Sequence, residues 1–302
     1  MDRHQRFAND GISIIPRWLP IAFILWIYAL TPAAAQHLGV GVAVQGGGDG
    51  AVLTDVVLIE GNEMFPVADA MEISFFSSVG GLAFVRGTQT IGEGSAGLFQ
   101  IEGSRDIFLS ATAHQVYDKG TGSFGALKDG NPDPGNMFFY SDVCKRIYSI
   151  KPGSLRIGTK NIDVKSRTQS TDLRASDWLI AKLAEPPCNK IRIPLAKAVR
   201  GEEFKKLNNL MVAGLYKRED GQIEKQYALC KPVQTEGTGA KKIAFHGCST
   251  LKGGSGGSMI VVGDDGRPKI IGIHRGVSDE SWSLGANEGV LFTPELLKEI
   301  AK

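Results

Sequence analysis

Short apolar runs separated by turn-forming residues make up most of the chain from Val79 onward. The clearest runs are 82–85, 96–101, 107–110, 178–183, 259–262 and 270–274, with Gly, Asp and Asn between them. Apolar runs of this length, bounded by such residues, are typical of β-strands. Asp264-Asp265-Gly266 lies between the last two runs and predicts a tight hairpin. The pattern therefore predicts an all-β body.

The last residues have the pattern of a short amphipathic helix. Thr293 suits the N-cap position, and Pro294 suits the first helical position. Three apolar residues then fall on one face of this helix: Leu296, Leu297 and Ile300. We therefore expect a C-terminal helix after the last strand.

Composition agrees with this picture and excludes several classes of protein. The chain has 302 residues, of which 38 are Gly and 13 are Pro. Glycine is well above its average share of ~7%, which favours short strands and tight loops over a helical bundle. The apolar share of 42% is too high for a wholly disordered chain. A formal net charge of +2 with no basic run offers no footprint for nucleic acid, so we expect no such partner.

Residues 1–35 have the composition of a secretory signal peptide. Three arginines precede the uncharged stretch 18–30, and the small residues Ala33 and Ala35 follow it at a cleavage-site spacing. The stretch is shorter than the ~20 apolar residues that span a bilayer. An uncleaved membrane anchor is the alternative. With cleavage after Ala35, we expect a secreted or periplasmic product without a membrane span.

Residues 36–76 are harder to interpret. A glycine-rich start at 39–50 precedes apolar runs at 52–59 and 64–76. We interpret this segment as an N-terminal extension or propeptide, with an extra strand as the alternative.

All four cysteines follow the predicted cleavage site: Cys144, Cys188, Cys230 and Cys248. An even number of cysteines in an exported chain predicts disulfide bonds. Because the chain has no Cys-x-x-Cys pair, we expect neither a zinc ribbon nor a redox motif of that type. Four cysteines allow three pairings, and their number and spacing do not choose among them.

Three short motifs carry groups that could act together in catalysis. Ser255 lies within Gly253-Gly254-Ser255-Gly256-Gly257, where glycines permit a bent backbone whose N–H groups can hold an oxyanion. His114 ends an apolar strand beside small residues, and Asp177 opens another apolar strand. Taken singly, each has a plainer explanation: a flexible glycine turn, an ordinary histidine and a turn-forming aspartate.

In the order His114, Asp177, Ser255, these motifs resemble those of the chymotrypsin-like (trypsin-like) serine proteases. That family has a strand ending Ala-His, an Asp followed by an apolar strand, and Gly-x-Ser-Gly-Gly. The resemblance covers 79–302. It is closest to the bacterial glutamyl-endopeptidase-like branch, on the segments 79–84, 248–250 and 272–274.

The resemblance implies two six-stranded antiparallel barrels with a C-terminal helix. The first barrel would span 77–188 and carry His114 and Asp177, and the second barrel with the helix would span 189–302 and carry Ser255. The active site would lie between the two barrels.

The resemblance also implies roles for the residues of the motifs. Ser255 would be the nucleophile, and His114 would be the general base and later the general acid. Asp177 would orient His114, and the N–H groups of Gly253 and Ser255 would form the oxyanion hole. Neither a metal nor an organic cofactor is implied.

Two departures from the family pattern lie close to these residues. Gly254 stands where the animal enzymes have an Asp that pairs with the new N-terminus after activation, and Arg275 stands where a small Ser is usual beside the Asp. Two hypotheses of function follow. One is an exported, monomeric endopeptidase that cleaves protein or peptide substrates, and the other is a catalytically inactive secreted binding protein of the same fold.

For the cysteines we predict a Cys230–Cys248 pair. Residues 227–230 and 243–248 look like neighbouring strands of the second barrel, joined by a polar loop at 235–242. Cys144 and Cys188 then form the remaining pair.

Thr250 and His274 match positions that bind substrate in the resembled glutamyl endopeptidases. There, these residues bind the carboxylate of the residue before the scissile bond, so the resemblance implies cleavage after acidic residues. A hydroxyl and an imidazole can both donate to a carboxylate. A strand histidine packed in the barrel is the alternative for His274.

Overall fold

The computed structural model describes residues 42–43, 58–59, 62–86, 89–116, 127–128, 131–132, 134–160, 162, 169–217 and 222–302. All of them belong to the unit Val40–Lys302. The predicted signal peptide at 1–35 lies outside the described residues. Among those described, no helix combines the length and apolar character needed to cross a membrane.

A sheet of seven antiparallel strands forms the first half of this unit. In sheet order the strands are β10 (Arg146–Ser149), β9 (Met137–Ser141), β4 (Val79–Arg86), β5 (Gln89–Phe99), β6 (Phe108–Ala111), β12 (Leu179–Lys182) and β11 (Arg156–Ile157). Its buried side chains include Leu82, Leu98, Leu109, Phe139 and Leu179, which pack together in one cluster. All of them except Phe139, which is on β9, come from the predicted apolar runs.

A sheet of nine strands forms the second half. Along its main path the order is β16 (Pro232–Thr238), β17 (Lys241–His246), β20 (Asn287–Leu291), β19 (Pro268–Gly276), β18 (Ser258–Val262), β14 (Leu210–Lys217), β15 (Ile223–Cys230) and β3 (Met64–Pro66). The ninth strand, β13 (Leu195–Ala196), pairs in parallel with β19. The predicted hairpin at 264–266 joins β18 to β19.

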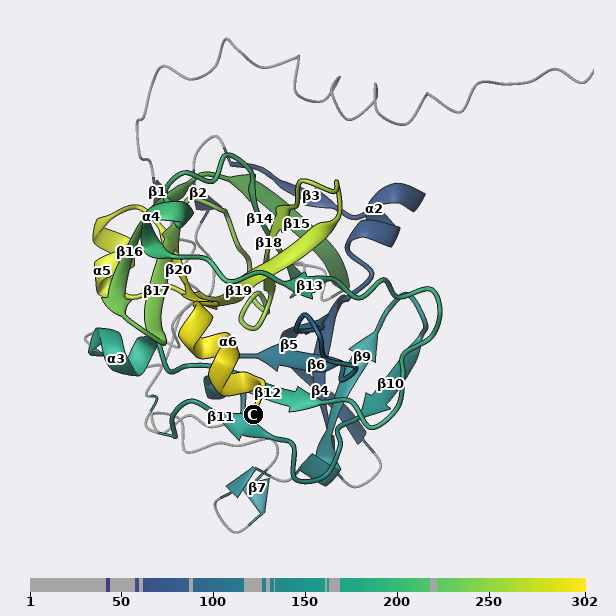
Figure 1. Ribbon diagram of the computed structural model, residues 1–302. Coiled ribbons are helices and arrows are strands. Elements are labelled where there is room, and N and C mark those ends of the chain that lie inside the picture. Colours follow the sequence, from purple (N-terminus) through teal and green to yellow (C-terminus); the bar gives the residue numbers. More distant parts are fainter. Residues whose placement is uncertain are drawn as a thin grey trace, which may run out of the picture. The chain divides into compact units, whose positions relative to one another are not determined.

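The two sheets pack against one another around a shared core. Figure 1 shows the mainly blue and teal strands of the first sheet below the mainly green and yellow strands of the second. β14 lies against β4 and β5. A single apolar cluster contains residues of both sheets, among them Phe99, Phe108, Ile180, Phe245 and Ile273.

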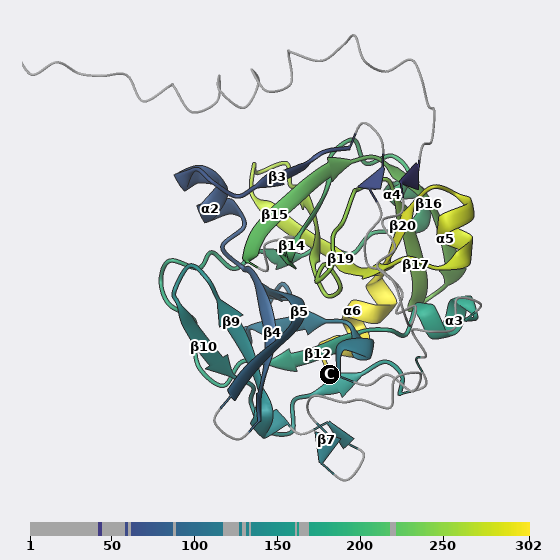
Figure 2. The ribbon, with the colours of Figure 1, turned by 180° about the vertical axis from the view of Figure 1, so that it is seen from behind.

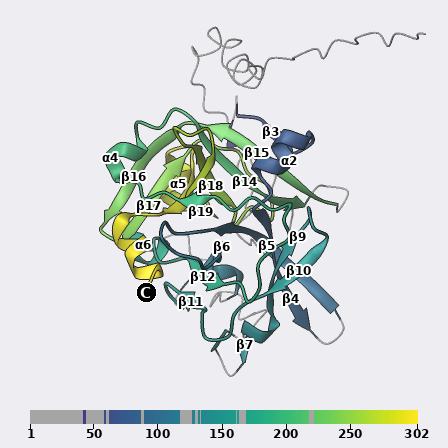
Figure 3. The same cartoon turned by 45° about the vertical axis from the view of Figure 1, so that its right-hand side comes forward.

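The C-terminal helix α6 (Pro294–Ile300) covers this shared core. The Thr293 side chain accepts a hydrogen bond from the Leu296 N–H, which is the predicted N-cap. Leu296, Leu297 and Ile300 are buried in the cluster that includes β12 and β17 residues. Figure 3 shows α6 beside these strands. The prediction of an all-β protein with a C-terminal helix is therefore confirmed. The sheets hold seven and nine strands rather than six each, since short strands such as β3, β11 and β13 add to them.

The remaining elements are short. Two strand pairs are β1 (Val42–Ala43) with β2 (Leu58–Ile59) and β7 (Leu127–Lys128) with β8 (Asn131–Pro132). The short helices are α2 (Ala70–Phe75), α3 (Thr171–Arg174), α4 (Gly201–Phe204) and α5 (Asp279–Ser283). The 3-10 turns are η1 (Ala113–Gln115) and η2 (Pro134–Asn136). Two of them, η1 and α3, position the candidate site.

Part of the predicted N-terminal extension is built into the second sheet. β3 pairs with β15 at the sheet edge, as Figure 2 shows from behind. After α2, the ring of Phe76 stacks on that of Tyr227 with centroids 4.6 Å apart. The described end of the segment 36–76 thus supplies an extra strand and a helix.

Two disulfides are present, Cys144–Cys188 and Cys230–Cys248, and these are the pairs expected from the sequence. The reason given for the second pair was wrong. Residues 235–242 are not a loop, because β16 and β17 occupy most of them and meet in a tight turn. β15 and β17 are not neighbours in the sheet. The two cysteines meet because the Gly247 N–H donates to the Lys231 carbonyl at 3.0 Å, which brings the ends of β15 and β17 together.

Candidate active site

His114 lies at the end of β6, in the turn η1. The Thr112 N–H donates to the Gln115 side-chain oxygen at 2.8 Å, and the Thr112 hydroxyl donates to the same oxygen at 2.9 Å. These bonds close the turn that carries His114. The imidazole is 14% exposed, so one edge of the ring can be reached from outside.

Asp177 is buried directly beside His114. Its Oδ2 accepts from His114 Nδ1 at 2.7 Å, and its Oδ1 accepts from the His114 backbone N–H at 2.9 Å. The two residues meet because β12, which follows Asp177, pairs with β6, which precedes His114. Burial alone would raise the pKa of Asp177, but His114 and Arg275 outweigh it and hold that pKa below its ordinary value.

Asp172, the other aspartate shortly before β12 in the sequence, does not contact His114. It is exposed in α3, where its carboxylate binds Lys241 Nζ at 3.0 Å. Of the two aspartates before β12, only Asp177 contacts His114.

Ser255 lies in a tight loop between β17 and β18. Gly253 and Gly256 have φ values of 95° and 85°, which suit glycine. A Cβ on Gly256 would lie 2.1 Å from the Ser95 carbonyl oxygen, so no larger residue fits there. In the described part of the chain, the backbone N–H groups of Gly253 and Ser255 have no hydrogen-bond partner. Two such groups are what an oxyanion hole requires.

The Ser255 hydroxyl donates to the Arg275 carbonyl at 3.0 Å. Among the hydrogen bonds of the described residues, none joins this hydroxyl to His114. His114 Nε2 lies 3.4 Å from the Thr112 hydroxyl. The structure therefore brings His114 and Asp177 together and leaves the Ser255 hydroxyl on the Arg275 carbonyl.

Gln115, which the sequence analysis did not identify, links the histidine turn to the serine loop. Its Nε2 donates to the Ser255 carbonyl at 3.0 Å and to the Ser95 carbonyl at 3.1 Å. The Ser95 N–H in turn donates to the carbonyls of Gly253 and Ser255, both at 3.0 Å. These bonds hold the serine loop against the first sheet. They depend on contacts between the sheets, for which the sequence carries no local signal.

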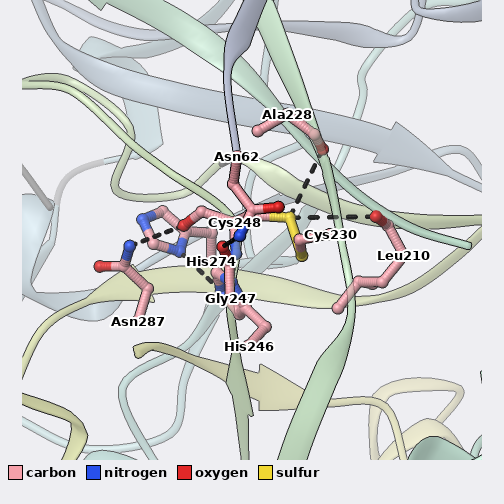
Figure 4. Close-up of a disulfide and its surroundings, with 9 residues drawn as sticks. All are labelled: Asn62, Leu210, Ala228, Cys230, His246, Gly247, Cys248, His274 and Asn287. Atoms are coloured by element: carbon pink, nitrogen blue, oxygen red, sulfur yellow. Dashed lines mark hydrogen bonds between the residues drawn. A yellow bond between two sulfur atoms is a disulfide. The ribbon is translucent and has the colours of Figure 1, made fainter. Parts of the chain in front are cut away.

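His274 lies on β19 beside the serine loop and pairs with a second buried histidine. A Cβ on Gly254 would lie 3.5 Å from its Cδ2. His246 Nε2 lies 3.2 Å from His274 Nδ1, and His246 Nδ1 accepts from the Cys248 N–H at 3.3 Å. Figure 4 shows both rings next to the Cys230–Cys248 disulfide.

These hydrogen bonds determine which nitrogen of each histidine ring carries the proton. Because His246 Nδ1 accepts, its proton is on Nε2 and is donated to His274 Nδ1. The proton of His274 is then on Nε2, a buried atom with no hydrogen-bond partner in the described part of the chain. Burial lowers the pKa of His246 to about 3. Burial, with the charges of His246, His114 and Arg275, also lowers the pKa of His274, while the Glu288 carbonyl weakly opposes this. His274 is thus a neutral donor.

Thr250 is buried in the segment between Cys248 and the serine loop. No hydrogen bond joins Thr250 to His274 within the described residues. The two residues predicted to bind substrate therefore flank the serine loop without touching through a hydrogen bond.

Possible metal ligands gather at one place in the described residues: Cys230, His246 and Cys248. Because the two sulfurs form a disulfide, they do not supply the thiolates that a metal ion would need.

Comparison with known proteins identifies the fold. No protein-family model matches the chain, and no curated protein matches it. A solved structure of a Glu endopeptidase in complex with MPD is similar, with a TM-score of 0.53 and 14% sequence identity, over 80% of this chain and 97% of that chain. The similarity shows the fold of the present chain, the chymotrypsin-like double barrel, and a fold does not by itself establish an activity.

Proposed function

We propose that this chain is an exported serine endopeptidase that acts through Ser255, His114 and Asp177. The observation that supports this most is the 2.7 Å hydrogen bond between His114 and the buried Asp177, in a turn that Gln115 links to the serine loop. Export is proposed from residues 1–35 and agrees with the two disulfides. The monomeric state expected from the sequence remains a prediction.

The proposed reaction has two halves. The Ser255 hydroxyl gives its proton to His114 Nε2 as the oxygen attacks the carbonyl carbon of the scissile bond. The N–H groups of Gly253 and Ser255 stabilise the oxyanion, and His114 gives the proton to the leaving amine as the C–N bond breaks. Water then hydrolyses the acyl-enzyme by the same route. Asp177 accepts the hydrogen bond from His114 Nδ1–H, so that Nε2 is the unprotonated nitrogen that takes the Ser255 proton.

One observation favours the second candidate, a protease-fold binding protein without activity. The Ser255 hydroxyl is bonded to the Arg275 carbonyl, and the first step requires it to leave that carbonyl for His114 Nε2. Catalytic hydrogen bonds are often absent before substrate binds, so this rotamer is compatible with an enzyme. If the hydroxyl stays on Arg275, the chain can bind peptides but not cleave them.

Labelling with a fluorophosphonate separates the two candidates. The reagent reacts only with an activated serine, so the proposed enzyme is expected to carry one label, on Ser255, found by peptide mapping. His114→Ala should abolish labelling, whereas Ser258→Ala, in the adjoining strand, should not. A folded protein that takes no label at Ser255 would support the binding protein instead.

We further propose that the enzyme cleaves after acidic residues. His274 presents an N–H that lacks a partner in the described residues, and the buried Thr250 flanks the same loop. An incoming carboxylate would accept from this N–H, and its charge would draw His274 toward the protonated form. His274, which burial keeps neutral in the unbound protein, would thus gain a positive charge only when a substrate carboxylate binds beside it.

Replacing His274 with alanine tests this preference. A hydrogen bond to a carboxylate contributes about 1.5–3 kcal/mol, so kcat/KM for peptides with Glu or Asp before the scissile bond should fall about 10- to 10²-fold. Peptides with Ala at that position serve as the internal control and should change little. Cleavage of a mixed peptide library gives both values. Cleavage mainly after Ala or Val that survives the substitution would show that the pocket has another specificity.

A further inference from the structure

Arg275 places a buried guanidinium against the carboxylate of Asp177. Its side chain is 5% exposed, and its Nε donates to Asp177 Oδ2 at 2.8 Å. The same oxygen accepts the Nδ1 hydrogen bond of His114. One carboxylate oxygen is therefore shared by an arginine and by the histidine of the site.

A β-bulge explains how a residue of β19 comes to face Asp177. In the pairing of β19 with β20, His274 is opposite Gly289 and Gly276 is opposite Glu288, so Arg275 is an extra residue. A bulge bends the strand and redirects the side chain of the extra residue. Arg275 is also the residue whose carbonyl holds the Ser255 hydroxyl.

Glu288 neutralises Arg275 from the side away from Asp177. It is fully buried on β20, and its Oε1 accepts from the Arg275 guanidinium. Its Oε2 accepts from Arg174 at 2.6 Å and from the Ser278 hydroxyl at 2.9 Å. The guanidinium of Arg275 is thus fixed between two buried carboxylates.

Arg174 completes a closed ring of contacts. Its guanidinium binds Glu288 and also Glu280 and Glu236, at 2.5 and 3.0 Å. Its backbone carbonyl accepts the Asp177 N–H at 3.1 Å. Asp177 is therefore held through its side chain by Arg275 and through its backbone by Arg174, and Glu288 joins the two arginines.

We propose that Arg275 is a positioning residue for the reaction of Ser255, His114 and Asp177: it keeps the Asp177 carboxylate ionised and turned toward His114. This inference rests on the proposed function. A carboxylate that is fully buried takes up a proton unless charges or hydrogen bonds compensate it. The planar guanidinium supplies both, because one N–H binds Asp177 while another binds Glu288.

The charges around His114 and Asp177 determine whether replacing Arg275 raises or lowers the pH at which the site takes up protons. In the described residues, Arg275 from β19 contacts Asp177 directly, and Glu288 from β20 and Arg174 from α3 lie behind it. His274, also on β19, is neutral. The positive charge of Arg275 opposes protonation of both Asp177 and His114. Its removal should therefore make the site take up protons at higher pH.

The variant Arg275→Met keeps an unbranched apolar side chain at this position and removes the charge. The acid limb of its kcat/KM–pH profile should lie about one pH unit above that of the wild type. Arg275→Lys keeps the charge, so its acid limb should stay close to that of the wild type even where its rate is lower. Active sites are counted by fluorophosphonate titration, so that loss of folded protein does not enter the comparison.

Nuclear magnetic resonance of 13C-labelled histidine follows His114 without any turnover. The His114 signal, assigned from its loss in His114→Gln, should titrate at higher pH in Arg275→Met than in the wild type. If Arg275→Met does not fold, Arg275→Gln, which is also uncharged, takes its place. A histidine shift in a protein that cleaves nothing would contradict the proposed function alone. An unchanged titration and an unchanged acid limb in a folded, uncharged variant would overturn the role of Arg275.

Discussion

Ser255→Ala is expected to lower kcat about 10⁶-fold on any peptide that the wild-type protein cleaves. The alanine variant keeps the glycine-bounded loop and the backbone N–H groups at 253 and 255, and it loses only the side-chain oxygen proposed as the nucleophile. Ser258→Ala is the matched control. The Ser258 hydroxyl is buried without a hydrogen-bond partner in the described residues, so its loss should cost little. Rates on one fluorogenic peptide, with folding checked by circular dichroism, give the comparison.

Two outcomes would contradict the expectation in different ways. Equal rates for Ser255→Ala and the wild type would mean that another residue, or a contaminating protease, cleaves the peptide. A folded wild type as inactive as Ser255→Ala would mean that the Ser255 hydroxyl stays hydrogen-bonded to the Arg275 carbonyl. The second outcome would favour the binding protein.

The contacts that could be predicted from the sequence are those set by a single motif and the strand beside it. His114 and Asp177 each adjoin a strong apolar strand, and those two strands, β6 and β12, are neighbours in the first sheet. The glycines around Ser255 likewise predict a bent loop, because left-handed φ values favour glycine. The C-terminal helix was predicted for the same reason, since its N-cap and apolar face lie within a few residues.

What could not be predicted depends on long-range pairing. Residues 235–242 are polar and contain glycine, so their sequence predicts a loop. In the structure, part of this segment belongs to β16, whose residues are mostly half-buried at the end of the sheet path. Gln115 and His246 were missed because their partners, Ser255 and His274, come from distant parts of the chain. A polar residue with no motif around it gives no sign of such a partner.

Arg275 shows how a departure from a family pattern can become informative once contacts are known. In the sequence it stands where a small Ser is usual, and nothing there indicates how a buried charge is accommodated. In the structure its charge is compensated by Asp177 and Glu288. Removing one partner of a buried charge pair lowers the free energy of unfolding by about 3–5 kcal/mol. Each member of the ring formed by Asp177, Arg275, Glu288 and Arg174 therefore tolerates few substitutions.

If the proposed function is right, Asp177→Asn is expected to lower kcat on the order of 10⁴-fold, as in established Ser-His-Asp triads. Three donors converge on the carboxylate: the His114 N–H, His114 Nδ1–H and Arg275 Nε–H. An asparagine side chain has one oxygen and one NH₂ group, so its NH₂ must face at least one of these donors. If the NH₂ faces His114 Nδ1, the ring proton moves to Nε2 and the base is lost. If it faces the backbone N–H, the turn that holds His114 is strained.

Asp172→Asn is the matched control for this last substitution. Asp172 lies five positions earlier, but it is exposed and binds only Lys241 through its side chain in the described residues. An exposed ion pair contributes at most about 1 kcal/mol, so the rate should be unchanged within a small factor. Both variants are compared by kcat on one peptide after titration of active sites. A large loss in Asp172→Asn with little change in Asp177→Asn would show that Asp177 is not the residue that orients His114.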